Sequence, residues 1–555
     1  MIKANLIKSK KCTPHKIIKD ILCSIPFNNR YAKPYLKLAK HISDDYQVTD
    51  VADIEDISNY LFYKEYGIKL DKSTDFEKIK LENTNISSEN TIYRAIMYND
   101  KEKFITFTGI DGFDKDQKLK SDLYPYSHEG YSLLELCCYH GAVDCFKFLR
   151  TKFNSEITQR CLELSFLGGN KEIMSECFKY QKPDEVCMIH AIISHNIDYV
   201  TFLMNEYNLE IDLEHCGWYS DLNSFLVYFD QTNDINKCYS YSPMFDIPSL
   251  CKFFLSHHAN INYKDKCGNT ALCNAVYYNS KEVAKFLISQ GANISEKDNN
   301  GETVLCKAAF YNSKEIVELL VSSGEKDTNG ETALHFAAKN NSRETVEILI
   351  THGAAINDKN EEGETPLHVA AKNSSKETAV FLITHGAAIN DKNEEGETPL
   401  HIAASLNYHR TSKLLISHGA HINEKDNAGN TPLHCAAIFN CKDTAKILAS
   451  YDADLNNKNK DGYTALHIAT KKNRKDFIEI LISCGANINE KDDFGATALH
   501  TAAIWNYKEI VEFLILNGAN IHEKTNDGLT ALFYALSSKN KEIVDLLISH
   551  GANFD

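Results

Sequence analysis

The chain has 555 residues with 60 Lys plus Arg against 76 Asp plus Glu, and its net charge of -16 argues against nucleic acid as the main partner. Its 43% hydrophobic and 25% charged residues are typical of a folded protein, and it has neither an apolar run of roughly 18 residues nor a secretory signal. We therefore expect a cytoplasmic protein without a membrane partner. The 17 cysteines are scattered and never spaced as CxxC, which favours reduced thiols.

Residues 1–90 form the first expected domain, a helical leader of unknown function. Pro14, Pro26 and Pro34 punctuate short helical stretches such as ISNYLFYKEYGIKL. A stack of repeats exposes apolar surface at its ends unless another segment covers it. We expect the leader to cap the N-terminal end of the repeats that follow.

Residues 91–262 form the second expected domain, made of irregular helix pairs. Segments such as YSLLELCCYHGAVDCFKFLR and MIHAIISHNIDYVTFLMNEY repeat apolar residues at helical spacing. We expect about five such pairs, with shortened or missing loops between them. The last pair, from Ser224 to Asn262, contains an insertion near DQTNDINKCYSYSPMFDIP.

Residues 263–555 carry a regular repeat built on Gly-x-Thr-x-Leu. Successive glycines of this motif are 33 residues apart, except for one interval of 29 between the second and the third. The glycines are Gly268, Gly301, Gly330, Gly363, Gly396, Gly429, Gly462, Gly495 and Gly528. At the short interval VSSGEKDTNG replaces a longer form, so we predict a shortened loop and a weak joint or a change of curvature near Gly324.

One repeat unit, GETPLHVAAKNSSKETAVFLITHGAAINDKNE, contains two short helices and a loop. Thr365 can cap the first helix, and Pro366 suits its first position, as Thr398 and Pro399 do one repeat later. Most repeats then carry Asn, which tolerates the left-handed conformation of a tight turn. These residues are Asn279, Asn312, Asn341, Asn407, Asn440, Asn473 and Asn506.

The Thr-Pro-Leu-His-x-Ala-Ala signature and the Gly-Ala-x-Ile-Asn ending closely resemble an ankyrin repeat. The resemblance implies an all-α solenoid with short β-hairpin fingers. We expect nine regular repeats, preceded by about five degenerate ones and the helical N-terminal cap. More loosely, this order resembles large ankyrin families of protozoan parasites whose leading domain has no assigned function.

Six histidines occupy the same position of the signature, namely His335, His368, His401, His434, His467 and His500. Metal ligands lie about 2 Å from a shared ion, whereas equivalent residues of stacked helices lie roughly 10 Å apart. No catalytic partner accompanies each histidine. We expect no metal site, and the ankyrin resemblance implies a structural hydrogen-bond network between this histidine, the capping Thr and nearby backbone.

Ankyrin proteins usually bind partners on a concave face made of first helices and finger tips. Two kinds of side chain are candidates at the matching positions here. The apolar candidates are Phe310, Tyr311, Ile438, Phe439, Phe494, Ile504 and Trp505, and the charged ones are Lys339, Lys372, Glu361 and Glu394. Large aromatic side chains often anchor interfaces. Alternatively, some of these residues pack against their own neighbours and the charges are only solvated.

The sequence contains no nucleotide-binding, zinc-protease, hydrolase or kinase signature, so we expect neither an enzyme nor a cofactor. The leading hypothesis is a monomeric scaffold or adaptor that binds other proteins through its concave face. One alternative is a regulatory or substrate-delivery subunit of a kinase or ubiquitin-ligase complex. A cryptic enzyme within residues 1–90 is the other alternative.

Overall fold

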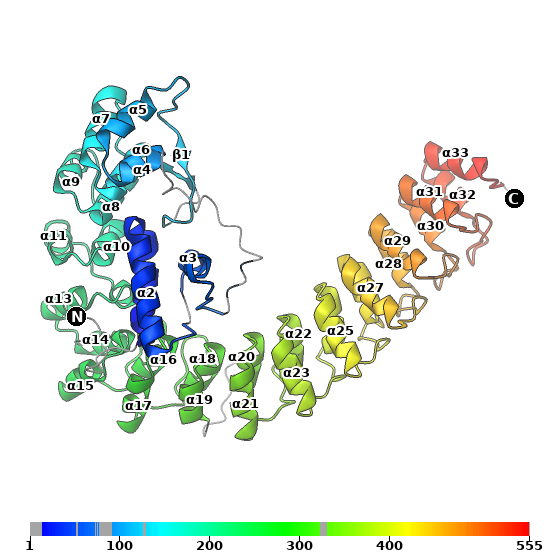
Figure 1. The fold of residues 1–555 in the computed structure, drawn as a ribbon. Coiled ribbons are helices and arrows are strands. Elements are labelled where there is room, and N and C mark those ends of the chain that lie inside the picture. The colour runs from blue at the N-terminus through cyan, green and yellow to red at the C-terminus, as the bar shows by residue number, and fades with distance from the viewer. Residues whose placement is uncertain are drawn as a thin grey trace. The chain divides into compact units, whose positions relative to one another are not determined.

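The computed structural model describes residues 14–51, 54–72, 74, 76, 91–125, 129–321 and 330–553. The chain divides into two units, Met1–Asp265 and Lys266–Asp555. Both consist mainly of short helices arranged in pairs (Figure 1). The weak joint predicted near Gly324 lies outside the described residues.

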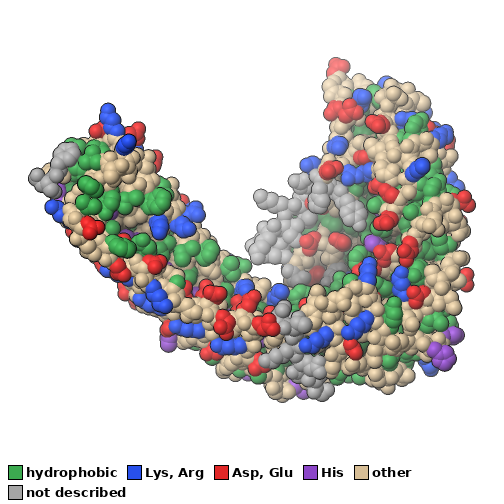
Figure 2. Space-filling view, turned by 180° about the vertical axis from the view of Figure 1, so that it is seen from behind, with side chains coloured by type: hydrophobic (Ala, Val, Ile, Leu, Met, Phe, Trp, Pro, Cys, Tyr) green, Lys and Arg blue, Asp and Glu red, His purple; other side chains and the backbone are tan. Residues whose placement is uncertain are grey.

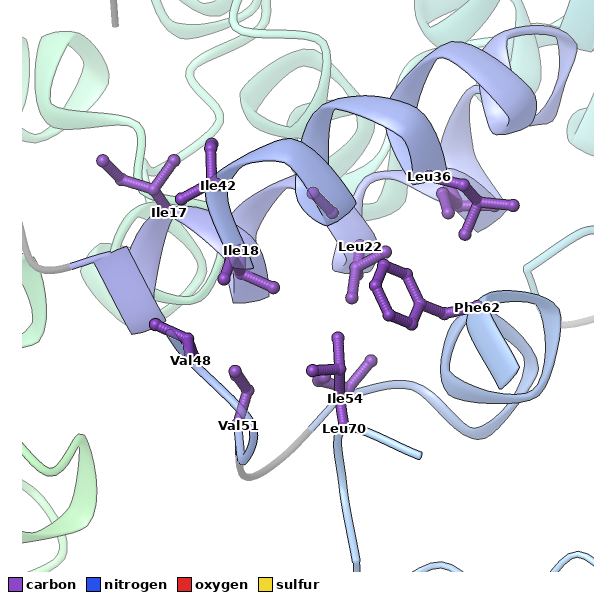
Figure 3. Close-up of a cluster of buried hydrophobic side chains, with 12 residues drawn as sticks. Ile17, Ile18, Leu22, Leu36, Ile42, Val48, Val51, Ile54, Phe62 and Leu70 are labelled. Carbon is purple, nitrogen blue, oxygen red and sulfur yellow. The ribbon is translucent and has the colours of Figure 1, made fainter. Parts of the chain in front are cut away.

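The first unit begins with a small helical domain, here called the N-terminal domain, within residues 14–76. Its apolar core joins Ile18, Leu22, Phe62 and Leu70, all fully buried (Figure 3). Pro14, Pro26 and Pro34 each lie in the first turn of a different helix of this domain. A backbone N–H at such a position has no partner within the helix, so proline costs no hydrogen bond there. Its elements are α1 (Pro14–Cys23), η2 (Ile25–Phe27), η3 (Asn29–Tyr31), α2 (Ala32–Tyr46) and α3 (Asp56–Tyr66).

Six helix pairs follow in the described part of the first unit, one more than expected. Their helices are α4 (Ile92–Met97), α5 (Lys101–Thr108), α6 (Leu133–His140), α7 (Val143–Phe153), α8 (Gln159–Gly168), α9 (Lys171–Cys177), α10 (Glu185–Ile193), α11 (Ile197–Tyr207), α12 (Leu213–Trp218), α13 (Leu222–Thr232), α14 (Ile235–Tyr241) and α15 (Pro248–Ser256). A two-stranded antiparallel ribbon, β1 (Lys118–Leu119) with β2 (Tyr131–Ser132), precedes α6.

The extra pair arises because the segment expected as an insertion is itself helical. The Asp234 side chain accepts a hydrogen bond from the Lys237 N–H and so caps α14. The 3-10 helix η5 (Ser242–Phe245) follows, and Pro248 then opens α15. Helix α13, assigned by the sequence to the last repeat, instead pairs with α12.

Nine helix pairs make up the described part of the second unit. The first helices are α16 (Ala271–Tyr277), α18 (Val304–Phe310), α20 (Ala333–Lys339), α22 (Pro366–Lys372), α24 (Pro399–Ser405), α26 (Pro432–Phe439), α28 (Ala465–Lys471), α30 (Ala498–Ile504) and α32 (Ala531–Ser537). The second helices are α17 (Lys281–Ser289), α19 (Lys314–Leu320), α21 (Arg343–Thr351), α23 (Lys376–Thr384), α25 (His409–Ser417), α27 (Lys442–Ser450), α29 (Lys475–Ser483), α31 (Lys508–Leu516) and α33 (Lys541–Ser549).

Within the second unit, first helices stack on first helices. Helices α18, α20 and α22 lie on the concave side of this unit, and α19, α21 and α23 on its convex side (Figure 1). Leu367, Ala370 and Ala371 of α22 are buried between neighbouring repeats. Alanine allows this close approach, so each repeat is stabilised mainly by the repeats beside it.

The loops between repeats close as hairpin turns. In one of them the Asn360 N–H donates to the Glu364 carbonyl at 3.0 Å, and the Asn360 side chain accepts from the Glu364 N–H at 2.8 Å. Gly363 has φ of +72°, and a Cβ there would lie 2.8 Å from the Glu394 nitrogen of the next finger. Glycine is therefore required both by the turn and by the stacking of the fingers.

Every Asn predicted for the turn between the two helices has a positive φ, from 51° at Asn279 to 60° at Asn440. The prediction of a left-handed turn is confirmed. In each helix pair, the residue with positive φ between the two helices is called the turn residue below.

Replacing the turn residue Asn506 by Val is expected to lower the free energy of unfolding by about 1–2 kcal/mol, because a β-branched side chain clashes with the backbone at positive φ. Its φ is 59°. Chemical denaturation measures the change. Asn506→Gly is the matched control and is expected to change stability little, since glycine adopts this conformation freely. Equal stability of the two variants would show that conformation is unimportant at this position.

Candidate functional site

The repeated histidine closes a hydrogen-bond network within its own repeat. The Thr365 N–H donates to His368 Nδ1 at 3.1 Å, and the Thr365 hydroxyl lies 2.8 Å from the same nitrogen. The other ring nitrogen, Nε2, lies 3.1 Å from the Glu397 carbonyl of the next repeat. Because that carbonyl can only accept, Nε2 carries the proton and Nδ1 accepts.

A bridge to a carbonyl of the next repeat recurs along the second unit, 29 residues ahead in every case except His500, whose acceptor Glu523 is 23 residues ahead. The Nε2 to carbonyl distances are 3.0 Å for His335 to Glu364, 3.0 Å for His401 to Asn430, 2.9 Å for His434 to Tyr463, 3.1 Å for His467 to Ala496 and 3.1 Å for His500 to Glu523. Burial lowers the pKa of both His368 and His434 to about 4. These side chains are therefore neutral links between repeats near neutral pH.

The candidate binding residues lie largely at one structural position. Phe310 and Tyr311 occupy the two positions directly before the turn residue of their repeat, and so do the Ile438–Phe439 and Ile504–Trp505 pairs. We call these two positions the turn pair. The exposed fraction is 62% for Phe439 and 53% for Trp505. Phe310 and Ile438 are half-buried.

Phe310 and Tyr311 belong to an aromatic cluster that packs partly against itself. The ring centroids of Tyr277 and Tyr311 are 4.9 Å apart, and those of Phe310 and Phe336 are 6.3 Å apart. Lys339 places its ammonium 5.9 Å from the centre of the Phe310 ring. Tyr277 was not selected from the sequence, although it occupies the same turn-pair position and the register identifies it.

The charged candidates divide between paired and solvated side chains. Lys372 lies 3.0 Å from Glu364 and 3.6 Å from Glu362, so its charge is already neutralised within its own repeat. Glu361 and Glu394 are exposed at finger tips. Phe494, also at a tip, is 67% exposed, and the fixed backbone of the finger holds it in place.

Side chains of four consecutive repeats form an exposed row, here called the C-terminal row. It comprises the exposed turn-pair side chains at the ends of α24, α26, α28 and α30, namely Leu406, Phe439, Lys471, Lys472, Ile504 and Trp505. Figure 2 shows hydrophobic side chains gathered over the C-terminal repeats. Leu406 was missed by the sequence analysis, because serine precedes it where other repeats have a larger residue.

In the first unit, the N-terminal domain covers turn pairs. The Arg30 guanidinium donates to the His140 carbonyl at 2.6 Å, and Lys16 Nζ donates to the Met244 carbonyl at 2.9 Å. The Phe27 ring packs edge-on against Tyr219, with centroids 5.4 Å apart. His140, Tyr219 and Met244 are turn-pair residues of α6, α12 and the α14–η5 segment.

The expectation that the leader caps the end of the array stays a prediction, and the contacts of the N-terminal domain described here extend along the side of several pairs. Tyr139, the other turn-pair residue of α6, donates its hydroxyl hydrogen to the Pro26 carbonyl at 2.7 Å. Asn29 donates to the Leu123 carbonyl at 2.9 Å. The domain therefore lies along the side of several pairs, because its polar groups find partners at the carboxyl ends of first helices.

The second unit also contains a polar groove of about 400 Å³ beside α16 and α18. Lys307 in this groove lies 2.6 Å from Asp298 and 3.0 Å from Glu302. Burial opposes its charge, but hydrogen bonds to these two carboxylates raise the pKa of Lys307. The charge of Lys307 is thus balanced by two carboxylates inside the groove. Within the described ranges, no group of three His, Cys, Asp or Glu side chains is arranged to hold a metal ion.

Comparison with known families agrees with this architecture. Six overlapping windows that together span residues 244–555 match the family profile described as "Ankyrin repeats (3 copies)", and they cover more than half of the chain. The chain belongs to the ankyrin-repeat family. Residues 153–228 match "Domain of unknown function (DUF3447)", a segment that the structure folds as degenerate ankyrin-like pairs from the end of α7 to α13.

Other comparisons are less extensive. No curated protein matches this ankyrin-repeat protein in sequence. A solved structure entitled "Crystal structure of the ankyrin repeat domain of Bcl-3: a unique member of the IkappaB protein family" is 25% identical, covers 40% of this chain and 99% of its own, and gives a TM-score of 0.38. No helix in the described parts of the chain combines the length and apolar character needed to span a membrane.

Proposed function

We propose that this ankyrin-repeat protein is an intracellular scaffold or adaptor that binds other proteins through the first-helix side of its second unit. The observation that carries the proposal is the C-terminal row, in which Phe439 and Trp505 are more than half exposed. Aromatic side chains held on rigid elements are frequent interface anchors, since they bury much area at little entropic cost.

The surroundings of the row support the same function. Its residues stand at the ends of stacked first helices, where buried alanines fix the spacing between repeats. Phe494 adds an exposed apolar side chain at a finger tip. Exposed Lys339, Glu361 and Glu394 supply charges that influence partner choice more than affinity. Phe310 and Tyr311 form a second, weaker contact area, because their rings already pack on neighbours.

The proposal is tested by proximity labelling in cells with the intact chain and with Phe439→Ala/Trp505→Ala. We expect the double variant to lose a distinct set of labelled proteins, because hot-spot aromatics typically contribute about 2 kcal/mol or more each to binding. Phe310→Ala/Tyr311→Ala is the matched control and is expected to retain most of that set. An unchanged set in the first variant would refute the proposed interface.

Co-purification with the same variants examines the regulatory alternative. Stoichiometric recovery of a kinase or ubiquitin ligase, lost in Phe439→Ala/Trp505→Ala, would identify the protein as a subunit of an enzyme complex. We expect recovery of non-catalytic partners instead, with the chain itself monomeric by light scattering.

A further inference from the structure

We infer that the C-terminal row binds one amphipathic helix of a partner protein, which runs along the four repeats and places a carboxylate against Lys471 and Lys472. This inference rests on the proposed function and adds the chemical class of the partner to it.

The first unit shows how α1 and the two 3-10 helices after it lie on turn pairs. Lys16 of α1 reaches the turn pair of α14–η5, and Asp20, one helical turn later, interacts with Ser220, the turn residue between α12 and α13. Arg30 then reaches the turn pair of α6. The segment from 16 to 30 thus crosses the pairs in the order opposite to the chain. At the ends of α24, α26, α28 and α30 in the second unit, exposed side chains at the same positions form the C-terminal row.

The spacing of the row matches a helix. Neighbouring first helices are roughly 10 Å apart, and a helix advances about 10.5 Å in seven residues. The three steps from Leu406 to Trp505 therefore correspond to about 21 residues. A helix of this length presents one contact residue to each repeat at seven-residue intervals, all on one face.

The charge of the row selects the partner. Lys471 and Lys472 are exposed, and neither lies within ion-pair distance of a carboxylate in the described part of the chain. The Lys471 ammonium lies 5.0 Å from the centre of the Tyr463 ring. Lys372 differs, because two glutamates of its own repeat already pair with it. A carboxylate on the partner therefore adds an attraction that the chain itself does not supply.

The chain's own N-terminal domain does not meet these requirements. It binds turn pairs through basic side chains that donate to carbonyl oxygens. In the repeats of the C-terminal row, two turn-pair carbonyls already accept a hydrogen bond from the following repeat. Cys441 Sγ donates to the Ser405 carbonyl at 3.2 Å, and the Tyr507 hydroxyl donates to the Lys471 carbonyl at 3.5 Å. A basic helix would also be repelled by the two lysines, which favours an acidic partner over a second copy.

The test uses the full chain and a fluorescein-labelled helical peptide of about 24 residues. From its N-terminus, the peptide carries Leu, Glu, Leu and Leu at seven-residue intervals to face Trp505, Lys472, Phe439 and Leu406. A second peptide has Lys in place of the Glu, and a third is interrupted by proline. Fluorescence anisotropy at low salt gives the dissociation constants.

We expect the Glu peptide to bind about tenfold more tightly than the Lys peptide, and the proline peptide to bind weakly. Lys471→Ala/Lys472→Ala is expected to remove the preference for the Glu peptide over the Lys peptide. Phe439→Ala/Trp505→Ala is expected to weaken the binding of both of these peptides. Failure of the Glu peptide to bind, or equal affinities for the Glu and Lys peptides, would overturn the inference. If the peptides failed in this way but proximity labelling still depended on Phe439 and Trp505, the proposed scaffold function would be supported and only the proposed class of partner would be wrong.

Discussion

Acidification from pH about 7 to about 4.5 is expected to destabilise the second unit strongly, because its buried histidines are neutral in the fold. The pKa of both His368 and His434 is lowered to about 4, and burial also lowers the pKa of His401, His467 and His500. In the unfolded chain a histidine has a pKa of about 6.5. Between these values the unfolded state binds more protons, so stability falls as the pH falls.

The effect is large because it recurs in consecutive repeats. A shift from 6.5 to about 4, as for His434, corresponds to on the order of 3 kcal/mol per histidine once the pH lies below the folded value. Protonation also converts Nδ1 from an acceptor to a donor and breaks its bond from the Thr431 N–H. Thermal unfolding as a function of pH measures the loss.

His434→Gln is the matched control, since glutamine does not titrate. We expect this variant to be less stable at neutral pH and to depend less on pH than the unchanged chain. A variant with the same pH dependence as the parent would show that other groups cause the acid sensitivity.

Release of the N-terminal domain is the second large expected effect. Arg30→Ala/Tyr139→Phe removes a charged hydrogen bond to the His140 carbonyl and the hydroxyl bond to the Pro26 carbonyl. The first of these bonds is partly buried and the second is buried. Such bonds contribute about 1–3 kcal/mol each, so we expect hydrogen exchange in α1 and in the turns after α6 and α12 to accelerate about 100-fold or more. Hydrogen exchange with mass spectrometry measures it.

The location of the change distinguishes the observed arrangement from an end cap. An end cap would protect α4 and α5, the first pair of the array, whereas the contacts observed here protect the turns that follow α6 and α12. Lys33→Ala, at an exposed position of the same domain, is the control and is expected to leave exchange unchanged. Faster exchange confined to α4 and α5 would contradict the structure.

Much of the second unit follows from the sequence because its determinants are local. Thr365 and Pro366 begin a helix, Asn506 forms a left-handed turn, and a constant register repeats these features. Conformational preferences of this kind act within a few residues, and an identical environment recurs every 33 positions. The repeated histidine could be assigned to the architecture for the same reason, since its position in the register excludes a shared ion.

The tertiary structure alone decided which turn pairs are available for binding. Tyr311 and Phe439 have the same place in the register, yet Tyr311 packs beside Tyr277 and Phe310 and is 38% exposed, whereas Phe439 is 62% exposed. It also decided where the N-terminal domain lies, through contacts such as that of Lys16 with Met244, which are 228 positions apart. Exposure and long-range docking depend on side chains from different repeats that share no period, so no local pattern encodes them.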